Sequence, residues 1–140
     1  MCNFKEQIFD KTVVGYKVAI VDKSGHYHSA ITGIRYEKGK IPAPKTYGKH
    51  SIRSIIGIND ILNGQSGYRE LYQGHTAIFL TKSDADYLLG EWESTYNVRG
   101  HNFYNFVLLK IKLSGDIWTG DYNGNPVYIG SEIISIEKLK

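Results

Sequence analysis

The segment FVLLKIKL, residues 106–113, does most to limit the folds open to this chain. Side chains two apart share one face of a strand, and here apolar residues recur at every second position. The pattern predicts a strand with one apolar face and one wet face, which must pack in a sheet over a core. The apolar face carries Val107, Leu109, Ile111 and Leu113, and the wet face carries Lys110 and Lys112.

Other segments also have the composition and spacing of strands. Residues 15–22 (GYKVAIVD) and 26–31 (HYHSAI) flank turn residues at 23–25, which predicts a hairpin, and residues 34–40 extend it into a meander. A buried strand is expected over 75–81 (HTAIFLT). In the C-terminal part, Asn123-Gly124 and Gly130 are expected to form turns between short extended pieces.

Two segments are expected to be helical. Thr81 or Ser83, followed by Asp84 and Asp86, is a typical helix start. The apolar stripe of this helix would consist of Tyr87, Leu88, Leu89 and Trp92. A second, shorter helix is expected within residues 51–64, ended by Asn63-Gly64. The sum is an α+β fold, a mainly antiparallel sheet with two helices, in a single domain over residues 1–140.

Composition and charge exclude several classes of protein. No stretch approaches the roughly 18 apolar residues of a membrane span. The formal net charge of +3 comes from scattered basic residues, which favours anionic ligands mildly and makes nucleic acid an unexpected partner. The N-terminus does not resemble a secretory signal, and the single Cys2 can form no internal disulfide. A cytoplasmic location is therefore expected.

The segment GHYHSAITGIRYEKGK, residues 25–40, raises the question of a metal site. His26 and His28 are two apart and should point to the same side of a strand. A zinc site needs at least a third protein ligand, and no Cys or His-rich motif accompanies them. We therefore expect no metal and no cofactor, and interpret the pair as solvated or as facing a pocket.

Common catalytic motifs are missing from the sequence. It contains no GxSxG, Walker loop, GxGxxG or HExxH, and Cys2 has no assignable base beside it. The sequence leaves open whether the chain is an enzyme and favours a protein without catalytic activity.

The second half of the chain, about residues 67–140, resembles ADP-ribosyltransferase-like domains. The resemblance lies in GYRELYQGHTAIFLTKSDADYLL, NFVLLKIKLSGDI and NPVYIGSEIISIEKLK, which follow a similar order of strand, helix, strand and strand. It implies an enzyme that uses NAD, with Glu132 as the acid that stabilises an oxocarbenium-like transition state. Thr81 would stand for the Ser-Thr-Ser strand of that family, and Arg35 would be its early arginine.

In size and style the chain also resembles small phage or prophage accessory proteins. These include anti-Thoeris and anti-CBASS sponges, which sequester the nucleotide signals of bacterial defence systems. A sponge needs guanidinium groups for phosphates and aromatic faces for adenine, without an acid or base placed for chemistry. Arginines lie beside tyrosines or histidines in the connectors. The expected ligand-binding residues are Arg53, Arg69, Arg99, Tyr68, His75, His101 and Tyr104.

These observations lead to one expectation and two alternatives. We expect a non-catalytic protein that sequesters a small nucleotide-like anion, such as a cyclic ADP-ribose-type signal, in phage counter-defence. We also expect a homo-oligomer that completes the pocket across an interface, with no membrane partner. The alternatives are an ADP-ribosyltransferase-like enzyme using NAD and a protein-binding inhibitor.

Overall fold

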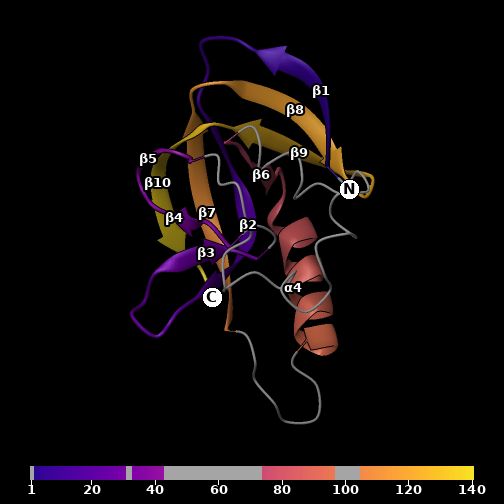
Figure 1. Cartoon of the computed structure of the whole chain (residues 1–140). Coiled ribbons are helices and arrows are strands. Elements are labelled where there is room, and N and C mark those ends of the chain that lie inside the picture. Colours follow the sequence, from indigo (N-terminus) through magenta and orange to yellow (C-terminus); the bar gives the residue numbers. More distant parts are fainter. Residues whose placement is uncertain (1, 31–32, 43–73, 97–104) are drawn as a thin grey trace, which may run out of the picture.

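The computed structural model describes residues 2–30, 33–42, 74–96 and 105–140, and all structural statements below concern these residues. They form one α-helix, α4 (Lys82–Tyr96), and a ten-stranded, mainly antiparallel sheet (Figure 1). The strands are β1 (Cys2–Ile8), β2 (Val13–Val21), β3 (Tyr27–Ser29), β4 (Arg35–Tyr36), β5 (Gly39–Lys40), β6 (Thr76–Phe79), β7 (Phe106–Ser114), β8 (Ile117–Tyr122), β9 (Asn125–Gly130) and β10 (Glu132–Lys138). The expected α+β class dominated by an antiparallel sheet is confirmed.

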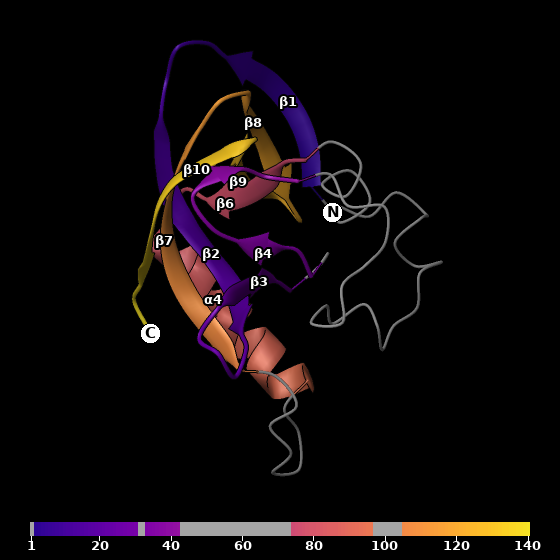
Figure 2. The ribbon, with the colours of Figure 1, turned by 60° about the vertical axis from the view of Figure 1, so that its left-hand side comes forward.

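The strands follow the order β1-β8-β9-β6-β2-β7-β10-β5, and β3 and β4 continue from β2 as a side branch. Figures 1 and 2 show that the sheet curves strongly. Strands β7 to β10 form one long hairpin. It has a corner where β7 gives way to β8 and β9 gives way to β10. Strand β7 pairs with β10, β8 pairs with β9, and Asn123-Gly124 closes the tip with positive φ at both residues.

The sheet has a core on each face. Val107, Leu109, Ile111 and Leu113 all lie in the core inside the curve, where Tyr36 and Ile78 also pack, so the predicted apolar face of residues 106–113 is confirmed. On the other face, α4 covers part of β2 and β7, with Ala85 and Leu89 packed against Val18 and Leu108. Leu108 is therefore buried although it shares a face with the exposed Lys110.

Helix α4 begins where its sequence predicts. The Thr81 hydroxyl accepts a hydrogen bond from the Asp84 backbone N–H at 3.3 Å, which is the contact expected of an N-cap residue. Leu88, Leu89 and Trp92 pack on the sheet as expected. Tyr87 does not, since it is 68% exposed and lies on the outer side of the helix. The expected stripe was therefore one residue too wide.

Several details differ from the expectations. Strand β1, whose sequence CNFKEQI is not a clean alternation, is held by antiparallel pairing with β8 rather than by its own pattern. Residues 34–40 form two short strands with a bend between them instead of one. Gly130 ends β9 at the corner of the long hairpin rather than forming a turn. The second expected helix, within 51–64, lies outside the described residues.

Within the described part of the chain, α4 does not have the length and apolarity that crossing a bilayer requires.

Candidate functional site: an ionic face on three strands

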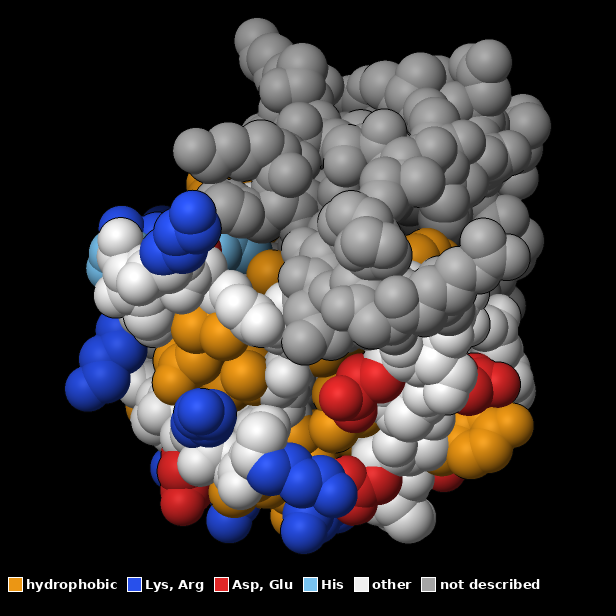
Figure 3. All heavy atoms as spheres, turned by 90° about the horizontal axis from the view of Figure 1, so that it is seen from below, with side chains coloured by type: hydrophobic (Ala, Val, Ile, Leu, Met, Phe, Trp, Pro, Cys, Tyr) orange, Lys and Arg blue, Asp and Glu red, His pale blue; other side chains and the backbone are white. Residues whose placement is uncertain are grey.

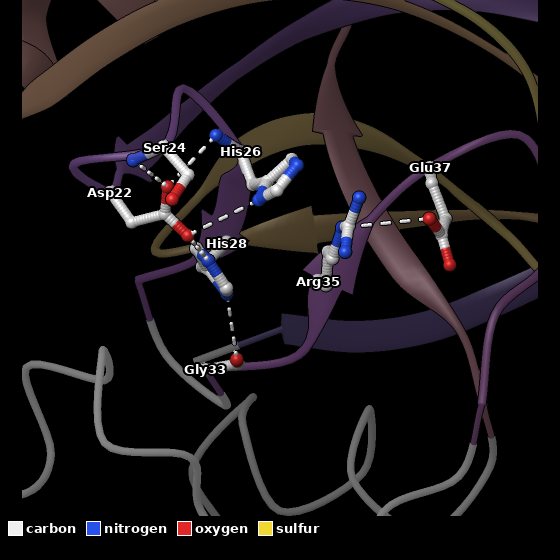
Figure 4. Close-up of polar contacts among 7 residues, drawn as sticks. All are labelled: Asp22, Ser24, His26, His28, Gly33, Arg35 and Glu37. Atoms are coloured by element: carbon white, nitrogen blue, oxygen red, sulfur yellow. Dashed lines mark hydrogen bonds and ion pairs between the residues drawn. The ribbon is translucent and has the colours of Figure 1, made fainter.

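Five ionisable side chains gather on one face of β3, β4 and the residues that adjoin β2, β3 and β4 (Figure 4). His28 is the register partner of both Ile20 on β2 and Arg35 on β4, so these residues share a face. His26 lies opposite Asp22, whose backbone N–H donates to the His26 carbonyl at 2.9 Å. We call the set Asp22, His26, His28, Arg35 and Glu37 the ionic face.

Asp22 is the centre of the ionic face. It directly follows β2, and its Oδ1 accepts the backbone N–H groups of Ser24 at 2.9 Å and His26 at 3.0 Å, which forms the β2–β3 turn. Its Oδ2 accepts from His28 Nε2 at 2.7 Å. The hydrogen bond from His28, followed by the backbone bond from His26, holds the pKa of Asp22 far below its ordinary value, against the effect of desolvation. The carboxylate is therefore charged at neutral pH.

His28 is the buried member of the ionic face. Its side chain is 10% exposed, and both of its ring nitrogens are engaged. Nε2 faces the Asp22 carboxylate, and Nδ1 lies 3.3 Å from the carbonyl oxygen of Gly33. Because both nitrogens are engaged, His28 presents no open ring nitrogen to a substrate in this structure.

His26 and Arg35 are the exposed members, and each is held by a carboxylate through only part of its side chain. His26 is 44% exposed and presents Nδ1 to Asp22 Oδ2 at 3.7 Å. Arg35 is 49% exposed and contacts Glu37 Oε2 through Nε at 3.5 Å. Among the described residues, no contact engages His26 Nε2 or the terminal Nη atoms of Arg35. Figure 4 shows both side chains standing on the same side of the strands.

This arrangement suits an anion better than a metal ion. The Nη atoms of arginine form a planar fork that matches two phosphate or carboxylate oxygens. His26 adds a further donor. Over residues 2–30, 33–42, 74–96 and 105–140, no group of three or more His, Cys, Asp or Glu side chains is placed to hold a metal ion.

His75, expected to bind ligand, lies in a buried cluster at the corner of the long hairpin. It is 7% exposed, and its Nε2 lies 2.9 Å from Asp116 Oδ2. Its ring meets Phe4 edge to face, with centroids 5.6 Å apart. Because the ring is enclosed and its Nε2 is engaged, its described contacts are those of a residue that supports the fold.

The three residues expected for the enzyme alternative do not meet in one place. Strand β6 pairs with β9 so that Thr76 faces Gly130 and Phe79 faces Val127. Thr81 therefore follows one end of this strand pair, and Glu132 follows the other. Arg35 lies on β4, where it contacts Glu37, while Thr81 caps α4.

The remaining expected ligand-binding residues lie outside the described residues. They are Arg53, Arg69, Arg99, Tyr68, His101 and Tyr104. Their convergence on one anion pocket stays a prediction.

Sequence reasoning noted the two histidines of the ionic face but missed the partner that organises them. Asp22 stands four residues before His26 and six before His28, and this short spacing across a predicted turn was the available signal. Because a hairpin brings residues on either side of its turn together, a carboxylate at the end of the first strand can reach both rings.

Comparison of the chain with protein-family models, with curated proteins and with solved structures found no match. The resemblances described above therefore depend on the quoted residues alone.

Proposed function

We propose that the protein binds a small nucleotide-like anion, such as a cyclic ADP-ribose-type signal, without turning it over. The observation that carries the proposal is the ionic face. There, among the described residues, no contact engages the Nη fork of Arg35 or Nε2 of His26, while Arg35 Nε and His26 Nδ1 each lie near a carboxylate oxygen, at 3.5 and 3.7 Å. A phosphate group can accept hydrogen bonds from both.

The carboxylates on the ionic face favour a specific site over a general attraction for anions. Glu37 and Asp22 offset much of the positive charge, so long-range attraction is small. They also restrain the side chains of Arg35 and His26, which lowers the entropy lost when a ligand orders them. Recognition would depend on the bidentate geometry of the arginine fork rather than on net charge.

The position of the candidate catalytic residues supports binding over turnover. Catalysis needs its groups in one productive geometry around the reacting atoms. Thr81 and Glu132 lie at opposite ends of the β6–β9 pair, and Thr81 is engaged as the helix cap. The described residues thus favour a binding protein over the ADP-ribosyltransferase-like alternative.

The distribution of charge favours a small ligand over a nucleic acid. On the face seen in Figure 3, Lys and Arg side chains are separated by hydrophobic and acidic ones and form no continuous stripe. Nucleic-acid-binding proteins typically gather basic residues along one face to follow the phosphate backbone. The described side chains on this face do not form such a stripe.

Arg35→Ala is expected to weaken the binding of a cyclic ADP-ribose isomer by about tenfold or more. Hydrogen bonds to charged groups contribute roughly 1.5–3 kcal/mol each, and the substitution removes a bidentate pair. Arg35→Lys should recover only part of the affinity, since it restores the charge without the fork. Isothermal titration calorimetry against a panel of cyclic ADP-ribose isomers, cyclic dinucleotides and inorganic phosphate measures the effect.

Lys38→Ala is the matched control for this experiment. Lys38 is an exposed cation on the segment that joins β4 to β5, and its removal changes the net charge equally. We expect an affinity within about twofold of the wild type, as is usual for an exposed charge. Equal losses in both variants, or none in Arg35→Ala, would remove the ionic face from the proposal. Failure of every nucleotide to bind would favour a protein partner.

Turnover is tested separately by incubating the protein with NAD and a cell lysate. The proposal expects no released nicotinamide and no modified protein, and bound nucleotide should be recovered intact after denaturation. Nicotinamide release that disappears in Glu132→Gln would instead establish the enzyme alternative.

A further inference from the structure

Both ring nitrogens of His28 face atoms that can only accept hydrogen bonds. One is the Asp22 carboxylate oxygen at 2.7 Å, and the other is the Gly33 carbonyl oxygen at 3.3 Å. A neutral imidazole carries one N–H, whereas an imidazolium carries two. Only the protonated ring can donate to both acceptors, so one contact must be lost when the ring is neutral.

We propose that His28 is a proton-dependent positioning residue that ties the β2–β3 turn to the chain at Gly33 and thereby positions Arg35 on β4. Protonation joins Asp22, His28 and Gly33 in one chain of hydrogen bonds. Loss of the proton leaves Gly33 without the His28 donor, because the shorter, charge-assisted bond to Asp22 is retained. The device belongs to the free protein and does not rest on the proposed function.

The location of Gly33 connects this proton to the ionic face. Gly33 has φ +79° and stands two residues before Arg35. Its N–H donates to the Ser29 carbonyl, and the Ser29 N–H donates to the Ile34 carbonyl, each at 2.8 Å. A bond from His28 to Gly33 therefore adds a third restraint to the segment that leads into β4.

Strand β3 packs chiefly on β2 and β4, and its charged neighbours act on His28 in both directions. From the β2 end, Asp22 favours the charged ring. His26 shares the same carboxylate oxygen at 3.7 Å, and Arg35 is the register partner of His28 on β4, so both oppose a second positive charge. Glu37 offsets Arg35. The contact of 2.7 Å with Asp22 is the closest of these.

The test is an NMR titration of the ¹⁵N-labelled full chain from about pH 5 to about pH 8, the range in which histidine changes charge. Long-range ¹H–¹⁵N spectra report the protonation of each ring nitrogen. We expect both nitrogens of His28 to be protonated at the acid end. The amide signals of Gly33 and Ile34 should then shift with the same midpoint as the ring. If those amides do not follow the ring in the wild type, the proposal is wrong.

Asp22→Asn gives the decisive comparison. An asparagine amide can donate to Nε2 while its oxygen still accepts the turn amides, so the neutral ring with its proton on Nδ1 satisfies Gly33 as well. The Gly33 amide should stop following the His28 ring in this variant, whereas a purely structural role would leave the coupling unchanged.

His26→Asn serves as the matched control, because it removes the other ring on the same carboxylate oxygen. We expect the coupling between His28 and Gly33 to persist. Its loss in His26→Asn, or its persistence in Asp22→Asn, would contradict the proposal. If Asp22→Asn does not fold, the wild-type titration together with His26→Asn still decides the question.

Discussion

Asp116→Ala is expected to lower the free energy of unfolding by about 3 kcal/mol, because it leaves one buried donor, on His75, and two partly buried donors, on Gln7 and Trp118, without their acceptor, and a buried donor without an acceptor costs roughly 1–3 kcal/mol. The Asp116 carboxylate accepts hydrogen bonds from Gln7 Nε2 at 2.5 Å, His75 Nε2 at 2.9 Å and Trp118 Nε1 at 3.1 Å. These side chains come from β1, from the residue preceding β6 and from β8. One carboxylate thus joins three parts of the sheet at the hairpin corner.

Chemical denaturation of Asp116→Ala beside Glu6→Ala measures this effect. Glu6 is an exposed carboxylate on β1, next to Gln7, and its removal should change the stability by no more than about 0.5 kcal/mol. A loss below about 1 kcal/mol in Asp116→Ala would show that water replaces the carboxylate at this corner.

The wild type and Asp116→Ala should also differ in how their stability depends on pH. Burial raises the pKa of Asp116, but the hydrogen bonds from Trp118 and His75 outweigh it and hold the pKa below its usual value. A carboxyl with a lowered folded-state pKa contributes stability above its unfolded pKa and loses it as the pH falls. The stability difference between wild type and Asp116→Ala should therefore shrink below about pH 4.

Gly15→Ala is expected to destabilise the protein by about 3 kcal/mol, at the upper end of the usual cost of overpacking. A Cβ at this position would collide with the Phe79 carbonyl oxygen and lie 2.9 Å from the Ile78 side chain. The backbone atom cannot rotate away, and in the described part of the chain β2 pairs with β6 through Tyr16 and Phe79. The added methyl group must push β6 off β2 and disturb both cores.

Gly90→Ala is the same chemical change, but it is expected to raise the stability of the protein rather than lower it. Gly90 lies inside α4, is exposed, and would bring its Cβ near nothing within 4 Å. Alanine is favoured over glycine in a helix interior by about 1 kcal/mol, so this variant should be more stable than the wild type. Thermal or chemical unfolding compares the two. If Gly15→Ala were as stable as Gly90→Ala, the close approach of β6 to β2 would be disproved.

Much of the fold follows from local patterns. The alternation over residues 106–113, the N-cap at Thr81 and the Asn123-Gly124 turn each reflect the conformational preferences of a few neighbouring residues. Such preferences act whatever the rest of the chain does. They predicted β7, α4 and the hairpin tip, but gave no reason to expect β1, whose pattern is weak.

The candidate site was less accessible to such reasoning. The histidines at 26 and 28 drew attention as a pair, and their common face is confirmed by contact with the same oxygen of Asp22. Which nitrogen of each ring stays free depends on the exact partner. The exact position of Glu37 likewise decides that Arg35 contacts it through Nε rather than through the Nη fork.

The sequence by itself determined where strands and the described helix could form, which faces were apolar and where the chain could turn. Only the tertiary structure decided that Gln7 meets Asp116, 109 residues away, and that Gly15 must admit the Phe79 carbonyl. The physical reason is that local propensity acts over a few bonds. Strand order and register, in contrast, are chosen by the burial of side chains from distant segments, which no single segment specifies.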